Sequence, residues 1–347
     1  MKVAKPVDNY IFIFGAGDEE MSRTVALVRQ LPAATTFLRF ATVDGIGVIP
    51  SNAYEADYTS EIALAVEFAV HRELRDGAVT TIVLVECGFN PDQVVLAGKN
   101  VVVLDHHREG DWGFDRPPRE AIQASSLGQL LRFFALKKLL GFVKEARKLP
   151  ATEVTGFRPG QVTAVDGRLL VTSFNGTYEL PVELAYVAAL DHNPGAVYQG
   201  KVPGLDGRTA VALRNGLRAK FKGITILELD KLMRRARAMM RGAPVVTIAG
   251  EPVVDLRGMK VPDSHEVSAQ DGVAVMYSIM DRSGRKKEGV IGASENVIDV
   301  WMSTSQVSGL SDLYGAPARG YAGGYHSLDV AHASHRLAAK FNVQAVS

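Results

Sequence analysis

The chain has 347 residues, of which 47% are hydrophobic, and a formal net charge of +1; these values predict about two domains with sizeable cores and argue against a surface that binds polyanions over the whole molecule. Its single cysteine, Cys87, excludes an intrachain disulfide framework and fits a reducing compartment. Because the sequence has no apolar run of membrane-spanning length and its start lacks the pattern of a secretory signal, we expect a cytoplasmic protein without a membrane partner.

Strand-like and helix-like segments alternate along the first third of the chain. Hydrophobic runs predict strands over residues 10–14, 36–41, 48–49, 80–85 and 101–104. Apolar residues at helical spacing predict helices over 22–31 and 55–76. Alternation of this kind is typical of βαβ units, so the sequence predicts an α/β fold with a mostly parallel sheet.

A helix and an antiparallel insert are predicted for the middle of the chain. Residues 125–149 carry an apolar stripe at helical spacing, and strand-like segments follow at 161–165, 168–174 and 177–180. Asp166-Gly167 and Asn175-Gly176 separate these segments, and both dipeptides favour two-residue hairpin turns. We therefore expect an inserted meander, followed by a segment over 182–190 that fits a helix or a strand, with the helix slightly favoured.

The last third begins with a basic helix and then changes in texture. A helix with five basic residues is predicted over 224–241, short strands and glycines dominate 243–292, and 331–341 has the pattern of a closing helix. We place a domain boundary in or just after the basic helix. This predicts a first domain of residues 1–240 with a hairpin insert, and a smaller α/β domain of residues 241–347.

The strand at 101–104 ends in Asp105, His106 and His107. In open α/β sheets, ligands gather just beyond the carboxyl ends of the strands, and carboxylate and imidazole groups suit divalent metal ions. The alternative is that these residues simply begin a polar loop. A second apolar segment also ends in an acid and a histidine, Asp191 and His192, so two chain segments can contribute to one site.

Three further segments accompany the Asp-His-His triplet in a defined order: residues 124–130 (ASSLGQL), residues 189–192 (ALDH) and residues 319–326 (RGYAGGYH). With this order and spacing the chain resembles the DHH phosphoesterase superfamily, which includes RecJ-like exonucleases, oligoribonucleases and hydrolases of small nucleotides. The resemblance spans most of the chain. It implies a DHH-type catalytic domain over 1–240 and a DHH-associated substrate-binding domain over 241–347.

Two acidic motifs depart from the pattern of that superfamily. Members usually carry His-x-Asp-x-Asp after the first strand, where this chain has Ala16, Asp18 and Glu20. After the next core strand they carry an aspartate, where this chain has Glu86. The added methylene moves the carboxylate outward by roughly 1.5 Å, a shift that backbone adjustment can absorb or that can abolish one metal site.

The resemblance implies a role for each of these residues. Members of the superfamily use one or two Mn²⁺ or Mg²⁺ ions, and paired ions about 3.5–4 Å apart activate water and stabilise charge on a phosphoryl group. Ligands are then expected among Asp18, Glu20, Glu86, Asp105, His106 and Asp191. Asp105 and His107 are the catalytic candidates, the first bridging or orienting and the second contacting phosphate or holding a carboxylate. Without a histidine at position 16, we expect one metal position to be weaker.

Residues near the end of the chain are predicted to bind the substrate. Gly323 and Gly324 in a loop would let backbone amides approach a phosphate, and Arg319 and His326 would add hydrogen bonds. A loop that needs positive φ values explains the glycines equally well.

These features predict a metal-dependent phosphoesterase that hydrolyses a phosphodiester or phosphomonoester in nucleotides or short oligonucleotides. The main alternative is a catalytically reduced DHH scaffold that binds single-stranded nucleic acid or a replication or repair protein. The altered acidic motifs favour the scaffold, whereas the complete Asp-His-His triplet and Asp191 favour the enzyme. A homodimer is compatible with either interpretation.

Overall fold

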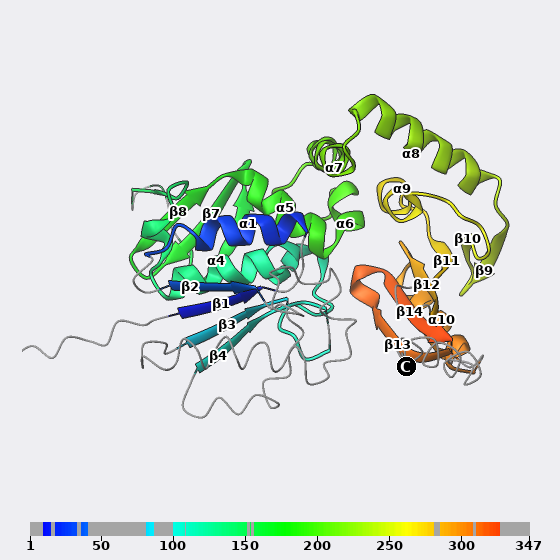
Figure 1. The fold of residues 1–347 in the computed structure, drawn as a ribbon, viewed down its shortest axis with the longest axis horizontal. Coiled ribbons are helices and arrows are strands. Elements are labelled where there is room, and N and C mark those ends of the chain that lie inside the picture. Colours follow the sequence, from blue (N-terminus) through cyan, green and yellow to red (C-terminus); the bar gives the residue numbers. More distant parts are fainter. Residues whose placement is uncertain are drawn as a thin grey trace, which may run out of the picture. The chain divides into compact units, whose positions relative to one another are not determined.

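The structure is a computed structural model that describes residues 10–14, 18–32, 36–40, 81–86, 100–107, 109–150, 153, 156–280, 285–307 and 310–326 (Figure 1). The chain forms two compact units, Met1–Leu217 and Arg218–Ser347. The expected strand at 48–49, the expected helices at 55–76 and 331–341, and Cys87 lie outside the described residues. Within the described part of the chain, no helix is long and apolar enough to cross a membrane.

The first unit contains the parallel sheet that the alternating pattern predicts. Its strands are β1 (Tyr10–Phe14), β2 (Thr36–Phe40), β3 (Thr81–Val85) and β4 (Asn100–Leu104), in the order β2-β1-β3-β4. All three strand pairs are parallel. Because Val85 on β3 is in register with Leu104 on β4, the residues that follow these two strands leave the sheet side by side.

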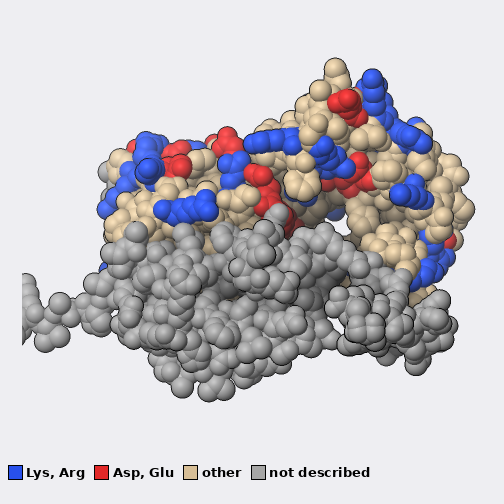
Figure 2. Space-filling model, in the orientation of Figure 1, with Lys and Arg blue, Asp and Glu red and all other residues tan. Residues whose placement is uncertain are grey.

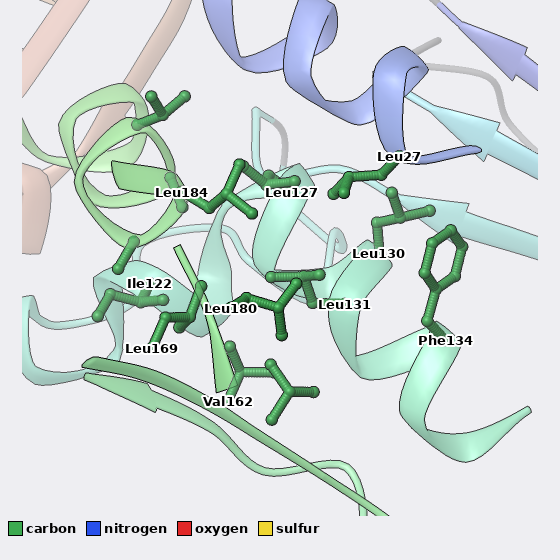
Figure 3. Packing of buried hydrophobic residues seen from close by; sticks show 14 of the residues in the cluster. Leu27, Ile122, Leu127, Leu130, Leu131, Phe134, Val162, Leu169, Leu180 and Leu184 are labelled. Atoms are coloured by element: carbon green, nitrogen blue, oxygen red, sulfur yellow. The ribbon is translucent and has the colours of Figure 1, made fainter. Parts of the chain in front are cut away.

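Helices pack their apolar residues against this sheet and against one another. They are α1 (Glu19–Val28), a 3-10 turn η2 (Pro118–Glu120), α3 (Ala121–Ala124), α4 (Ser126–Leu136) and α5 (Val182–His192). Residues labelled in Figure 3, among them Leu127, Leu130 and Leu131 of α4, belong to one large buried cluster. Segment 182–192 is therefore a helix, as slightly favoured by its sequence.

The predicted helix over 125–149 is wrong beyond Leu136. Lys138 adopts a left-handed conformation with φ of 61°, and the chain continues through a 3-10 turn η3 (Leu140–Phe142) to a short strand β5 (Arg147–Lys148). Leu139, Leu140 and Val143 are still buried. The apolar stripe thus continues into the core through irregular backbone, which the spacing of apolar residues alone does not reveal.

The hairpin insert is confirmed, but its second two-residue turn is Phe174-Asn175 and not the predicted Asn175-Gly176, because Ser173 pairs with Gly176. Strands β6 (Val162–Val165), β7 (Arg168–Ser173) and β8 (Gly176–Leu180) form an antiparallel sheet with β5, in the order β5-β8-β7-β6. Asp166 and Gly167 both have positive φ, at 49° and 73°, as a two-residue type I′ turn requires. Helices α6 (Pro194–Tyr198) and α7 (Gly207–Lys222) follow α5.

The second unit contains a six-stranded mixed sheet. After α8 (Ile226–Arg241) come β9 (Val245–Ile248), β10 (Glu251–Asp255), α9 (Ser264–Asp271), β11 (Val275–Met280), β12 (Lys286–Ile291), α10 (Glu295–Val307), β13 (Leu310–Ala316), a 3-10 turn η5 (Pro317–Arg319) and β14 (Tyr321–His326). The strand order is β13-β14-β12-β11-β10-β9, and only β10 and β11 pair in parallel. The molecule is α/β overall, but the expected mostly parallel arrangement holds only for the first sheet.

The basic helix α8 belongs to the second unit. Leu229, Met233, Ala236 and Met240 form its buried face and share a core with Val267 and Val275. The first compact unit therefore ends earlier than residue 240, where the sequence placed the boundary, because this apolar face packs with later segments.

The segment expected as a glycine loop is a strand. Gly323 and Gly324 lie within β14, between β12 and β13, and of the glycines in 319–326 only Gly320 has a positive φ, at 74°. A Cβ atom on Gly323 would lie 2.3 Å from the Tyr314 hydroxyl, and one on Gly324 would lie 2.5 Å from Leu313. These glycines leave room for side chains of the neighbouring strand, which explains them without an anion.

Candidate metal centre

Four buried or half-buried side chains from four separate elements meet in the first unit. Glu20 lies in the first turn of α1, Glu86 follows β3, His106 follows β4, and Asp191 lies at the end of α5. Each offers one ligand atom, and these four atoms all lie within 4.8 Å of one another. Three carboxylates and one imidazole form a donor set that suits Mn²⁺ or Mg²⁺. We call these residues the quartet.

The sheet brings Glu86 and His106 together. The backbone N–H of Glu86 donates to the Leu104 carbonyl at 3.1 Å, which extends the pairing of β3 and β4 by one step. Glu86 then turns into the left-handed region with φ of 51°, a conformation that a residue other than glycine seldom adopts. This turn accompanies complete burial of its side chain within the quartet.

Glu20 is held at the start of another helix. One of its carboxylate oxygens accepts a hydrogen bond of 2.8 Å from the backbone N–H of Leu127, in the first turn of α4. The Ser125 hydroxyl caps the same turn by accepting from the Gly128 N–H at 3.0 Å. A helix N-terminus favours negative charge, so α4 stabilises the ionised form of Glu20.

Three carboxylate oxygens of Glu20 and Glu86 have no hydrogen-bond donor among the described residues. Among the described residues, no N–H or hydroxyl group donates to either oxygen of Glu86 or to the second oxygen of Glu20, although all are buried. A buried carboxylate without donors is costly unless it takes a proton or binds a cation. The arrangement therefore fits a metal ion among these oxygens.

The two histidines of the triplet have different carboxylate partners. His106 is completely buried, and its Nε2 lies 3.3 Å from an Asp191 carboxylate oxygen. The Asp105 carboxylate accepts from His107 Nδ1 at 2.7 Å and from the backbone N–H groups of His106 and His107 at 2.7 and 3.2 Å. Asp105 therefore fixes the turn and orients His107, and it is not among the quartet.

Asp18 also lies outside the quartet. It is the N-cap of α1, and its side chain accepts from the Met21 N–H at 2.9 Å. Burial and the negative charge of Asp191 raise the pKa of Asp18 to about 6, which places it near the quartet electrostatically. Asp18 therefore begins a helix, as the alternative interpretation of this acidic segment holds. Its role as a metal ligand stays a prediction.

Two supporting residues escaped the sequence analysis. The Gln129 amide donates at 2.8 Å to the Asp105 carbonyl and at 2.8 Å to the Ala124 carbonyl, and so ties α4 to the triplet. Gly113 packs so closely that a Cβ atom there would lie 2.0 Å from the Ala124 carbonyl oxygen and 2.6 Å from His106 Cβ. Gln129 lies in the segment 124–130 on which the resemblance rests, but the sequence predicts no role for it, and the loop residue Gly113 has no distinctive spacing.

In the metal-free site, burial and neighbouring negative charges raise the pKa values of two carboxylates. Burial, followed by the negative charges of Asp191 and Asp18, raises the pKa of Glu86 to about 8. Burial and the charges of Asp191 and Glu86 raise the pKa of Glu20 well above its usual range. Burial also acts to raise the pKa of Asp191, but its hydrogen bond and charge interaction with His106 lower it overall.

The second histidine is shifted toward its charged form. Burial alone would lower the pKa of His107, but the hydrogen bond and charge of Asp105 outweigh burial and raise it to about 9. The same hydrogen bond lowers the pKa of Asp105 against the opposing effect of burial. Asp105 and His107 thus form an ion pair at neutral pH.

We expect the metal-free protein to lose stability as pH rises from about 5 to 9. Glu86 and His107 hold their protons to higher pH in the folded chain than in the unfolded chain, so the folded state binds more protons across this range and the free energy of unfolding falls with pH. One unit of pKa shift corresponds to about 1.4 kcal/mol. Thermal unfolding in chelator at several pH values measures the decline.

Addition of Mn²⁺ should reduce this decline, because a bound cation compensates the ionised carboxylates. A free energy of unfolding in chelator that is constant or rises between pH 5 and 9 would contradict the raised pKa values of Glu86 and His107.

The four residues predicted near the end of the chain lie in the second unit. His326 Nε2 lies 2.9 Å from a Glu288 carboxylate oxygen, and the Arg319 guanidinium lies 5.1 Å from the Tyr321 ring centroid. Gly323 and Gly324 lie in β14, next to the edge strand β13. Their role in substrate binding stays a prediction.

No protein-family model matches the chain, and a search of curated proteins also found no match.

Proposed function

We propose that the protein is a metal-dependent phosphoesterase of the DHH type that acts on nucleotides or short oligonucleotides. The observation that carries this proposal is the convergence of Glu20, Glu86, His106 and Asp191, whose ligand atoms lie within 4.8 Å of one another. The order of these residues along the chain also resembles that of the DHH motifs, with Asp105-His106-His107 after β4 and Asp191 on α5. This order supports the same proposal.

Each residue of the site has a distinct task in this proposal. Glu20, Glu86, His106 and Asp191 would hold one or two Mn²⁺ or Mg²⁺ ions, which supply Lewis acidity and a water of lowered pKa. His107 carries a positive charge at neutral pH because its pKa is about 9, so it can attract and orient a phosphate anion. Asp105 holds this imidazolium in place through the bond at 2.7 Å.

A second candidate function is a catalytically reduced scaffold that binds nucleic acid or a repair protein. Two observations favour it: the Asp18 carboxylate caps α1 and is not part of the quartet, and alanine stands at position 16. Under this proposal the site binds a metal weakly and does not turn over phosphoesters. Assays with mononucleotides, cyclic dinucleotides and labelled DNA and RNA oligomers in Mn²⁺ separate the two functions, because the scaffold would bind oligomers without cleaving them.

Substitutions at Glu86 test whether this side chain is a ligand. Glu86→Gln keeps the size of the side chain and removes its charge, so we expect at least a tenfold loss of Mn²⁺ affinity and of hydrolysis of a chromogenic phosphodiester. Glu86→Asp keeps the charge and should retain most of the activity. Equal rates for wild type and Glu86→Gln would mean that Glu86 does not bind the ion.

A further inference from the structure

One face of the six-stranded sheet in the second unit carries a group of tyrosines and cations. Strand residues alternate between the two faces, and Met276, Val290 and Ala322 pack with α10 on one of them. The alternate residues on the opposite face include Tyr277 on β11, Lys287 and Gly289 on β12, and Tyr321, Gly323 and Tyr325 on β14. Tyr314 on β13 pairs with Gly323. We call Tyr314, Tyr321, Tyr325, Arg285, Lys287 and Arg319 the tyrosine face.

Two glycines determine how tyrosines lie on this sheet. A Cβ atom on Gly289 would lie 2.6 Å from the Tyr277 hydroxyl, and one on Gly323 would lie 2.3 Å from the Tyr314 hydroxyl. The tyrosine rings therefore extend across neighbouring strands, over positions where any other residue would project.

Cations pack against these rings. The Arg285 guanidinium lies 4.4 Å from the Tyr325 ring centroid, and Lys287 Nζ lies 4.9 and 5.7 Å from those of Tyr314 and Tyr325. Tyr314 lies 6.4 Å from Tyr325 and 6.5 Å from Tyr321, centroid to centroid, in tilted arrangements. The three rings do not stack on one another, and all three are partly exposed.

Strands β11, β12 and β14 place a lysine but no acid on this face. On this face lie residues 275, 277 and 279 of β11, 287, 289 and 291 of β12, and 321, 323 and 325 of β14. None of these residues is an acid. Glu288 lies on the opposite face, where its carboxylate lies 2.7 Å from Lys286 Nζ and 2.9 Å from His326 Nε2. A ligand for the tyrosine face should therefore combine flat apolar groups with negative charge.

We infer that the tyrosine face binds unpaired nucleobases of single-stranded nucleic acid, with Lys287 and Arg285 contacting the phosphates. Aromatic residues on an open sheet stack bases of single strands in other sheet-based modules, and stacking is insensitive to sequence because every base has a flat face. The inference deepens the proposed function by naming single-stranded nucleic acid as the ligand, and it relies on that function only for the reaction.

The test measures binding and hydrolysis separately. Fluorescence anisotropy of labelled 12-nucleotide oligothymidylate and oligouridylate in chelator reports binding without cleavage. We expect Tyr325→Leu and Tyr314→Leu to weaken binding by about tenfold each, and Tyr325→Phe, which keeps the ring, to bind within about threefold of wild type. Lys287→Gln should weaken binding and reduce its salt dependence. Phe174→Leu removes an exposed aromatic residue of the first unit and serves as the matched control.

Several outcomes would overturn the inference. These are no detectable binding by wild type at low salt, equal binding by Tyr325→Leu, Lys287→Gln and Phe174→Leu, or equal affinity for a duplex and a single strand. The circular dichroism spectrum and the thermal unfolding midpoint of Tyr325→Leu should match those of wild type, which shows that this variant is folded. If wild type binds oligomers through these tyrosines but hydrolyses nothing, the proposed function fails and the tyrosine face stands.

Discussion

The double variant His106→Ala, Asp191→Ala should lose nearly all of its Mn²⁺ and lower the hydrolysis of a phosphodiester by at least about a hundredfold, more than substitution of a residue that merely orients a ligand. These two side chains face each other at 3.3 Å and supply the imidazole and one of the three carboxylates of the quartet. Removing both leaves no unpaired member of the His106–Asp191 pair, so a loss of metal cannot be attributed to an isolated buried charge. Metal content after dialysis, measured by mass spectrometry, gives the answer.

His265→Ala, Asp299→Ala is the matched control, because it removes the same residue types from exposed positions of the second unit. It should retain the metal content of wild type. Equal metal in both double variants would refute the site. An absence of metal from wild type itself, also under excess Mn²⁺, would favour the scaffold function.

Gly113→Ala should be among the most damaging substitutions of a single methyl group in this chain. The added carbon would meet the Ala124 carbonyl oxygen, the His106 side chain and the Gln129 amide, all within 2.8 Å. Backbone on one side and a quartet residue on the other leave little room for adjustment, so we expect a loss of about 3 kcal/mol of stability, near the upper end for overpacked cores. Mn²⁺ affinity should fall as well, because His106 must move.

Gly216→Ala provides the control for this prediction. Gly216 lies within α7, and a Cβ atom there would contact nothing within 4 Å. Alanine in place of an interior helix glycine should stabilise the protein by about 0.5–1 kcal/mol. Urea unfolding of both variants measures the two opposite shifts. A Gly113→Ala protein as stable as wild type would mean that the loop before α3 packs less tightly than the structure describes.

The sequence predicted which residues form the quartet better than it predicted the contacts that hold them in place. Glu86 and His106 each follow an apolar strand, and parallel pairing of adjacent strands is sufficient to place them together. The sequence links Asp191 to the triplet because its segment also ends in an acid and a histidine and because residues 189–192 resemble the later acidic motif of the DHH superfamily. The hydrogen bond from Leu127 to Glu20 joins residues 107 positions apart, and no local pattern encodes such a contact.

The second unit was predicted less well because two of its glycines are required by packing between neighbouring strands and not by the local backbone conformation. Gly323 and Gly324 looked like loop residues, since glycine weakens strands and is depleted in them. In the structure they pair with β12 and β13 and make room for Tyr314 and Leu313. Only the cross-strand register reveals that requirement, and periodicity along one segment cannot supply it. The Lys138 backbone reversal that ends α4 early is likewise invisible to apolar spacing.

The distribution of the quartet along the chain has a consequence for biosynthesis. Glu20, Glu86 and His106 are made before Asp191, and chains generally fold from the N-terminus as they are synthesised. A nascent chain therefore carries the sequences of the parallel strands and three of the four residues before the fourth is made. The repulsion between Asp191 and the two glutamates arises only when α5 packs against the rest of the unit. A cation that offsets this repulsion would favour that step, so we expect the yield of folded protein in the cell to depend on the supply of the ion.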